Sequence, residues 1–238
     1  MAEIHGIEVV VFDILGTLVD EPGGLRAALR DALPASDDAC DAPSDDAAVD
    51  ALLTVWQQHV ECEQRRIGQG HRAYANTEII DAEAAGRVAD RAGLTDPATI
   101  ARLATAGQRL PPWADSAAGL ERLARHFPLL GLSNASRTAL LRLNAHAGLR
   151  WHQALSAEAV LAYKPAPEVY QLAIDAAGCP PERVLMVAAH AWDLRGARAR
   201  GMRTAYVRRP AGDPPTGSDA FDGRFNGLDE LVTALTAR

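Results

Sequence analysis

The sequence predicts an α/β fold in which a doubly wound parallel sheet carries an inserted all-helical domain. The apolar run at residues 9–12 is typical of a strand that is buried on both faces. After residue 112, helix-like and strand-like segments alternate, which is the pattern that builds a parallel sheet with helices on both faces. Residues 21–111 instead show only helical periodicity and turns. We therefore expect a core made of residues 1–20 and 112–238 and a helical cap made of residues 21–111.

Within the expected cap, an acidic stretch rich in Ala, Pro and Asp at residues 34–46 predicts a loop. Residues 47–67 predict the best helix, because its apolar side chains fall close to one face: Leu52, Val55, Trp56, His59 and Val60. Two further helices are expected at residues 77–91 and 97–107.

The expected core continues after residue 112 with helices and strands in alternation. Helices are expected at residues 116–125, 136–147, 167–177 and 192–200, and strands at residues 128–133, 183–188 and 202–207. A turn-rich piece at residues 210–223 precedes a short C-terminal helix that begins at residue 228. No internal repeat is found.

The composition points to a globular protein that acts on small molecules. Of the 238 residues, 48% are hydrophobic, which suffices for a core. The net charge of −7 and the lack of a basic block give no support for a nucleic acid or an anionic membrane as partner. We expect a cytoplasmic location, because nothing near the N-terminus resembles a signal peptide and no segment is long enough to span a bilayer. The oligomeric state stays open, with a homodimer as one option.

The three cysteines, Cys40, Cys62 and Cys179, are an odd number without paired spacing. This argues against a disulfide framework and against a zinc site, so we expect reduced thiols.

Asp13 is the first candidate for chemistry. It follows the first strand and precedes Gly16 and Thr17, and ligands of parallel sheets bind beyond the carboxyl ends of the strands. A carboxylate presented in this way can act as a nucleophile. The alternative is an aspartate that only caps a turn or helix.

Three later segments carry further candidates. The strand near residue 130 ends in Ser133 and Asn134, Lys164 stands just before two prolines that favour a helix start, and Asp193 lies at the entrance of the helix after the strand near residue 185. The order Asp13, Ser133, Lys164, Asp193 resembles the four motifs of the haloacid dehalogenase superfamily over nearly the whole chain. The resemblance implies a Rossmann-like core with a helical cap.

In detail the motifs look like those of the L-2-haloacid dehalogenase (type II) branch. The phosphatases of the superfamily carry a second aspartate two residues after the nucleophile, where this chain has Leu15. They also carry a Gly-Asp pair before the last acid, where this chain has Ala188, Ala189 and His190. Magnesium requires several oxygen ligands. We therefore expect no metal and no cofactor.

The resemblance implies a role for each motif residue. Asp13 would displace the halide and form an ester, which water then hydrolyses, while Lys164 keeps Asp13 ionised. Thr17, Ser133 and the backbone N–H groups around Ile14 and Asn134 would hold the substrate carboxylate or the oxyanion, with Leu15 also contacting the substrate. The alternatives to these catalytic roles are that Lys164 is an ordinary solvated lysine at a helix start and that Ser133 acts only as a cap.

Asp193 would orient Lys164 and activate the hydrolytic water, or only cap its helix. Tyr170 resembles the family tyrosine that reaches the region of the nucleophile. Asn134 resembles a residue of the family that contacts the substrate on the side of the halide. Trp56 and Trp192 are expected either as apolar walls around the leaving group or as ordinary core residues.

This chain differs from the type II branch at two positions that would lie near the leaving group. Members of the branch carry an arginine immediately after the cap tryptophan, whereas Trp56 is followed by Gln57. His190 either supplies the missing positive charge when protonated or is a core histidine.

The favoured reaction is hydrolysis of a 2-haloalkanoate to the 2-hydroxyalkanoate with inversion. A close alternative is cleavage of another C–X bond beside a carboxylate, as in a strained cyclic amino acid. A magnesium-dependent phosphatase and a weakly catalytic ligand-binding relative are the alternatives from other classes.

Overall fold

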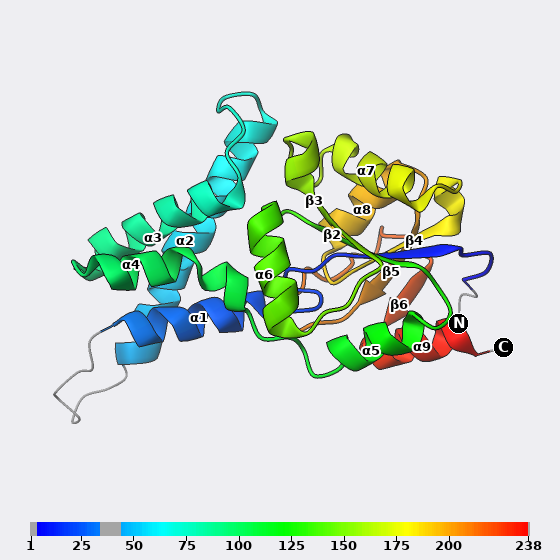
Figure 1. The fold of residues 1–238 in the computed structure, drawn as a ribbon, viewed down its shortest axis with the longest axis horizontal. Coiled ribbons are helices and arrows are strands. Elements are labelled where there is room, and N and C mark those ends of the chain that lie inside the picture. The colour runs from blue at the N-terminus through cyan, green and yellow to red at the C-terminus, as the bar shows by residue number, and fades with distance from the viewer. Residues whose placement is uncertain (1–3, 34–43, 238) are drawn as a thin grey trace.

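A computed structural model of the chain describes residues 4–33 and 44–237. It confirms the predicted α/β architecture, because the strands of this part of the chain form one parallel sheet in the order β3-β2-β1-β4-β5-β6, with helices on both faces (Figure 1). Cys40 and most of the predicted loop at residues 34–46 lie outside the described residues. Cys62 and Cys179 are free thiols.

Four of the strands were predicted and two were not. The strands are β1 (Val9–Phe12), β2 (Leu129–Ser133), β3 (Gln153–Ser156), β4 (Val184–Ala188), β5 (Arg203–Val207) and β6 (Gly223–Phe225). The two missed strands, β3 and β6, lie at the edges of the sheet, and neither has more than two consecutive buried residues. They lack the continuous apolar run of a strand that is covered on both faces.

Strict alternation along the strands divides the core helices between two layers. Val10 and Phe12 point toward the layer of α5 (Ser116–Leu123), α6 (Arg137–Ala147) and α9 (Leu228–Thr236). Val9 and Val11 point to the opposite layer of α7 (Pro167–Ala177) and α8 (Ala191–Ala199). Short 3-10 helices, η2 (Ala157–Val160) and η3 (Pro181–Arg183), precede α7 and β4. The predicted helix start at the prolines after Lys164 is confirmed by α7.

The helices that follow β1 gather away from the sheet, on the left of Figure 1. They are α1 (Glu21–Ala32), α2 (Ser44–Gly68), α3 (Thr77–Ala92), α4 (Pro97–Ala104) and the 3-10 helix η1 (Ala106–Arg109). The helix expected from residue 47 begins earlier, at Ser44. The helix expected at residues 97–107 is divided at Thr105, whose hydroxyl donates to backbone carbonyls of the preceding turn. The exact cap boundaries at residues 21 and 111 stay a prediction.

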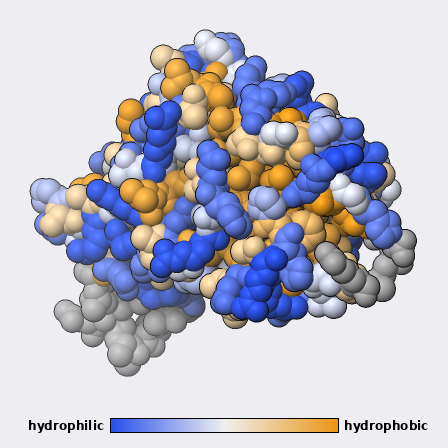
Figure 2. Space-filling model, turned by 45° about the vertical axis from the view of Figure 1, so that its right-hand side comes forward, coloured by the Kyte–Doolittle hydropathy of each residue, from blue (hydrophilic) through white to orange (hydrophobic). Residues whose placement is uncertain are grey.

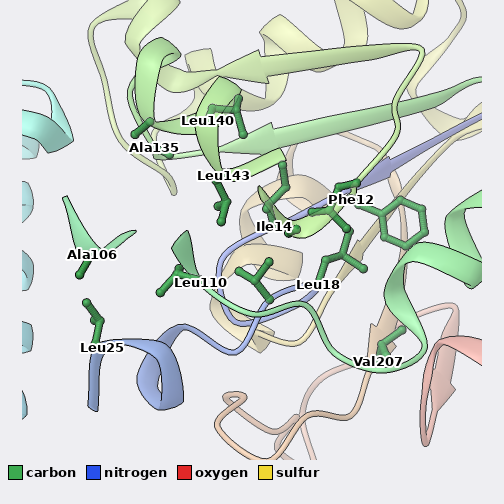
Figure 3. Packing of buried hydrophobic residues seen from close by; sticks show 14 of the residues in the cluster. Phe12, Ile14, Leu18, Leu25, Ala106, Leu110, Ala135, Leu140, Leu143 and Val207 are labelled. Carbon is green, nitrogen blue, oxygen red and sulfur yellow. The ribbon is translucent and has the colours of Figure 1, made fainter. Parts of the chain in front are cut away.

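One hydrophobic cluster joins these helices to the sheet (Figure 3). Leu25 and Ala106 lie on the cap side, and Leu110, Leu18 and Ile14 continue the cluster to β1. Burying side chains of this size stabilises the fold by roughly 1.5–3 kcal/mol each. The cluster therefore fixes the cap against the end of the strand that carries Asp13.

Polar contacts fix the cap at a second place, beside the carboxyl edge of the sheet. Thr77 and Glu78, at the start of α3, accept hydrogen bonds from the backbone N–H and the hydroxyl of Ser136 at 2.7 and 3.0 Å. Asn76 donates to Glu158 at 3.1 Å. The cap thus closes over the end of β2.

Outside these contacts the surface is mixed. On the face drawn in Figure 2, hydrophilic side chains are spread over the periphery and hydrophobic ones show through between them. None of the described helices combines the length and the apolar character needed to cross a membrane.

Candidate active site

Asp13 lies where the sheet reverses its strand order. β1 pairs with β2 on one side and with β4 on the other, and the chain runs outward from β1 in both directions. Such a switch point leaves a crevice beyond the carboxyl ends of the strands. The backbone N–H of Asp13 donates to Val187 of β4 at 2.9 Å, which fixes the residue at the mouth of the crevice.

The turn after Asp13 requires glycine. Gly16 has a φ of +76°, and a Cβ on it would lie 2.6 Å from Nε2 of His190. Only glycine meets both demands, because the left-handed region is unfavourable for other residues and the histidine ring fills the space.

Lys164 joins two carboxylates in the interior. Its Nζ lies 2.9 Å from Oδ1 of Asp13 and 2.8 Å from Oδ2 of Asp193, and its side chain is 1% exposed. The reading of Lys164 as a solvated surface lysine is therefore wrong. The N-cap position of α8 is held by His190, and Asp193 bonds Lys164 instead, so the capping reading of Asp193 is also wrong.

Tyr170 completes this chain of hydrogen bonds by donating to Oδ1 of Asp193 at 2.7 Å. A Cβ at position 196 would lie 2.4 Å from the hydroxyl oxygen of Tyr170, so Gly196 provides the room for the tyrosine to reach the aspartate. Both oxygens of Asp193 are engaged, and the tyrosine is held behind the lysine.

Burial and charge act against each other in this group. Burial alone would lower the pKa of Lys164, but the attraction of Asp13 and Asp193 outweighs it and holds the pKa above its ordinary value. Burial raises the pKa of Asp193, against the opposing effect of Lys164. Lys164 is therefore a permanent cation next to the nucleophile.

Thr17 aims the second oxygen of the nucleophile. Its hydroxyl donates to Oδ2 of Asp13 at 2.6 Å and accepts from the backbone N–H of Ala189 at 2.9 Å. The carboxylate of Asp13 is thus held at both oxygens by side chains of this chain. It does not act as a helix cap.

A brace on the far side of the loop holds Thr17, and no sequence pattern predicted it. Arg209 donates from Nε to the carbonyl of Thr17 at 2.8 Å and pairs through its terminal nitrogens with Asp115. Trp113 donates to the carbonyl of Gly16 at 3.2 Å. These residues come from the segments after the cap and after β5, and only the fold brings them together.

Ser133 and Asn134 separate in space although they are neighbours in sequence. Asn134 faces the cavity beside Asp13, and its Oδ1 accepts from the backbone N–H of Lys164 at 2.9 Å. Ser133 is fully buried, and its hydroxyl accepts from the N–H of Ala135 at 3.1 Å. Its position favours the alternative that Ser133 only caps the backbone after β2, since it is not among the residues that line the cavity.

A cavity of about 270 Å³ opens between the carboxylate of Asp13 and the cap. The core contributes Asp13, Leu15, Asn134, Ala135, Ala139, Lys164, His190 and Trp192. The cap contributes Glu21, Leu25, Trp56, Gln57, Val60, Glu61, Gln64, Thr77, Asp81 and Gly107. Tyr170 was expected at the substrate but is fully buried outside this lining. The side chain of Ile14 is also fully buried outside it, and the expected role of the backbone N–H groups around Ile14 stays a prediction.

The aromatic and polar residues predicted around the leaving group do meet in the cavity. Trp56 and Gln57 enter from α2, and Trp192 from the start of α8. His190 stacks on Trp192 with 5.8 Å between ring centroids, and its Nε2 lies 3.2 Å from the carbonyl of Leu15. Gln57 therefore faces the same space as the nucleophile.

Two carboxyl groups in the cap wall were not predicted. Burial raises the pKa of Glu21 to about 7, with His190 opposing and Asp13 adding to the rise. Burial, Glu21 and Glu78 raise the pKa of Asp81 to about 8. Sequence patterns could not find them, because each stands on a helix where an acidic residue near the N-terminus is ordinary.

The part of the chain that the structure describes has no group of three or more His, Cys, Asp or Glu side chains placed to hold a metal ion.

Comparisons with known proteins agree with this geometry. The model of the haloacid dehalogenase-like hydrolases matches residues 7–201. An (S)-2-haloacid dehalogenase of Pseudomonas putida is 30% identical over 207 residues, which cover 85% of this chain and 86% of the relative. The structure of an L-2-haloacid dehalogenase with 31% identity covers 97% of this chain and 100% of that protein, with a TM-score of 0.82. A Xanthobacter autotrophicus L-2-haloacid dehalogenase with covalently bound chloropropionic acid has 27% identity, a TM-score of 0.79 and coverage of 97% and 99%.

Proposed function

We propose that this chain, which belongs to the haloacid dehalogenase-like hydrolase family, hydrolyses 2-haloalkanoic acids to 2-hydroxy acids through an ester on Asp13. Its resemblance to the L-2-haloacid dehalogenases is confirmed by relatives of that name at 30% identity. The observation that carries the reaction is the carboxylate of Asp13, which lines the cavity while Lys164 and Thr17 hold its two oxygens at 2.9 and 2.6 Å.

In the first step, a carboxylate oxygen of Asp13 attacks the Cα atom of the substrate from the side opposite the halogen. The C–O bond forms as the carbon–halogen bond breaks, and the halide leaves with the bonding electron pair, which inverts the configuration. Lys164 supports this step because it keeps Asp13 ionised in a buried place. Thr17 limits the rotation of the carboxylate, so that the attacking oxygen is already oriented.

In the second step, water attacks the Cγ carbonyl carbon of the ester on Asp13. The bond between Cγ and the alkyl oxygen breaks, the 2-hydroxy acid leaves, Asp13 is restored as a carboxylate, and one proton passes to the solvent. Lys164 is close enough to stabilise the oxyanion that forms on Asp13. We assign Asp193 and Tyr170 to positioning, because both oxygens of Asp193 are already bonded to Lys164 and Tyr170.

The carboxylate of the substrate requires donors close to the nucleophile. We assign this role to the backbone N–H groups of Ile14, Leu15 and Asn134, at the carboxyl ends of β1 and β2. This placement puts Cα of the substrate over Asp13 and sends the leaving group toward Gln57 and Trp56 of the cap.

We propose that no metal takes part. The second motif acid, Asp193, has no oxygen left for a cation, and the position that would carry another acid holds Leu15. Magnesium prefers several carboxylate, phosphate and water oxygens in octahedral geometry. This set of residues favours the dehalogenase over a magnesium-dependent phosphatase.

A second candidate reaction is cleavage of another C–X bond beside the carboxylate by the same two steps. It is favoured by Gln57, which replaces the cation expected beside a departing halide, and by the two carboxyls of the cap wall. The cytoplasmic location, the lack of a nucleic-acid partner and the homodimer stay predictions from the sequence.

The decisive experiment combines halide release with isotope labelling. We expect bromide release from (S)-2-bromopropanoate, unaffected by a chelator. In a single turnover in heavy-oxygen water, label should enter Asp13 before it appears in the product. Asp13→Asn should stay folded and lose turnover, since an amide does not attack. Transfer of label straight from water to product, with Asp13 unlabelled, would contradict the ester. Phosphate-ester hydrolysis that requires magnesium would favour the phosphatase instead.

A further inference from the structure

We propose that Glu21 and Asp81 form a subsite for a protonated nitrogen, so that the preferred substrate is a carboxylic acid which also carries an ammonium group. This inference rests on the proposed function for the reaction itself and adds the chemical class of the substrate. It assigns a task to the cap wall of the cavity, which the two hydrolytic steps do not use.

The charges that line the cavity are unbalanced. Four carboxyls line it, from Asp13, Glu21, Glu61 and Asp81, against a single ammonium group on Lys164. Lys164 is already bonded to two carboxylates in the interior. In the empty cavity this imbalance is relieved in part by protonation of Glu21 and Asp81, and an ammonium group on the ligand would relieve it instead.

Glu21 and Asp81 differ from the other carboxyls because they lack partners. Within residues 4–33 and 44–237, Glu61 pairs with Arg65, but neither Glu21 nor Asp81 has a side-chain hydrogen bond or an ion pair. Both residues are half-buried in the cavity wall, so water in the cavity is what can solvate their carboxyls before a ligand binds. A ligand that displaces this water has to replace its hydrogen bonds, and an ammonium group can donate them.

The carboxyls of Glu21 and Asp81 interact electrostatically. Glu21, the first residue of α1, is among the causes that raise the pKa of Asp81 on α3. Asp13, which lines the same cavity, contributes in turn to the raised pKa of Glu21. A cation bound between Glu21 and Asp81 would lower the pKa of both groups and remove their repulsion.

The surroundings suit an organic cation. Leu25 and the buried ring of Trp56 also line the cavity from the cap and can cover the methylene groups that carry an ammonium nitrogen. An aromatic face also attracts a cation. The described residues offer no third His, Cys, Asp or Glu ligand here, as a metal ion would require.

Binding should therefore release protons. At neutral pH the raised pKa values leave much of the Glu21 and Asp81 pair protonated when the cavity is empty. An ammonium group favours the ionised pair, so the protons that the pair gives up pass to the buffer.

Two stable product analogues test the subsite without chemistry. (R)-4-amino-2-hydroxybutanoate and (R)-2-hydroxypentanoate differ only by an ammonium group in place of a methyl group. By titration calorimetry in two buffers of different ionisation enthalpy, we expect the amino acid to bind at least about tenfold more tightly and to release protons. Equal or weaker binding of the amino acid would overturn the proposal. That result is expected if the protonated pair instead donates hydrogen bonds to an anion.

Substitutions of the two carboxyls test whether they cause the preference for the amino acid. Glu21→Gln and Asp81→Asn should each reduce the preference for the amino acid severalfold, and the double variant should abolish it. The matched control is Asp90→Asn, the same change at an exposed position of α3, which should keep the preference. A preference that survives in the double variant would overturn the assignment to this pair. Bromide release from (S)-2-bromopropanoate, measured on the same proteins, tests the proposed function separately.

Discussion

The two walls of the cavity differ in how fully their polar groups are paired. On the core wall, Lys164 and Thr17 each bond Asp13, and both carboxylate oxygens of Asp193 have a partner within 2.8 Å. On the cap wall, the carboxyls of Glu21 and Asp81 have no hydrogen-bonded partner in the described part of the chain.

The difference separates two tasks. A reacting group must be held in one orientation before the substrate arrives, and a closed set of hydrogen bonds does this. A group that recognises a ligand must keep its bonding capacity free until the ligand binds. The core wall therefore sets the reaction, whereas the cap wall sets which substrate undergoes it.

The largest effect is expected from breaking the core wall at Lys164. Lys164→Met would leave two buried carboxylates facing each other, so we expect turnover to fall by roughly a thousandfold or more. The free energy of unfolding should fall by about 3–5 kcal/mol, as when a buried ion pair loses one partner. Halide release and urea denaturation measure the two effects. Adding Asp13→Asn should restore part of the stability but none of the activity; a variant that keeps a tenth of the wild-type rate would contradict the role of Lys164.

Asp81→Asn should have the opposite effect on stability, because the cap wall is unpaired. The folded-state pKa of Asp81 is raised from 3.8 to about 8, so ionising it opposes folding. Its contribution to stability is complete below the unfolded pKa and is lost as the pH rises to the folded pKa. The variant should therefore be more stable than the wild type, by roughly 2 kcal/mol in alkaline buffer, with a gain that grows between about pH 4 and pH 8.

Denaturant titrations of both proteins over this pH range provide the measurement for Asp81. Asp90→Asn, the same change at an exposed position of α3, is the control. A gain for Asp81→Asn that does not change with pH would show that the carboxyl is paired in solution.

A smaller effect is expected at the brace behind the nucleophile loop. Arg209→Gln removes the pairing with Asp115 and weakens the hold on the carbonyl of Thr17, which orients Asp13. We expect kcat to fall by about tenfold with KM unchanged, since the substrate does not touch Arg209. Steady-state halide release over a range of substrate concentrations separates the two constants. Arg209→Lys should recover part of the loss, whereas a change in KM alone would indicate a general distortion of the cavity.

The smallest effect concerns Gln57, on the cap wall. A cation aimed at a departing halide stabilises the transition state, and glutamine offers only a neutral N–H group. Gln57→Arg should raise the rate on 2-chloro acids by about threefold, and less on 2-bromo acids, whose leaving group needs less stabilisation. Equal rates on both substrates, at unchanged stability, would show that Gln57 is a bystander. The same arginine should weaken the binding of an ammonium ligand.

The sequence predicted the core wall better than the cap wall, for a physical reason. Asp13, Lys164 and Asp193 each follow a strand or precede a helix start, and parallel strands bring such positions to one edge of the sheet. Glu21 and Asp81 lie on helices whose packing angles no local pattern specifies. The same holds for Arg209, which meets Thr17 only because β5 lies two strands from β1.

The fold shows a similar division. The central strands were predicted because their residues are apolar on both faces, whereas the edge strands β3 and β6 form only by pairing with a neighbour. The roles of Ser133 and Tyr170 were also beyond reach, since the motif gives their order along the chain but not which side of Lys164 each one occupies.

Gly196 has a consequence for any collection of random variants of this protein. Its missing Cβ is the space that Tyr170 uses to reach Asp193, so even alanine would push the ring away. A screen for activity should therefore recover inactive clones changed at position 196, on the side of α8 that is turned away from the substrate. Such a clone would express and fold while turning over poorly. A map of tolerated substitutions would therefore show that activity requires glycine at this position, although it does not contact the substrate.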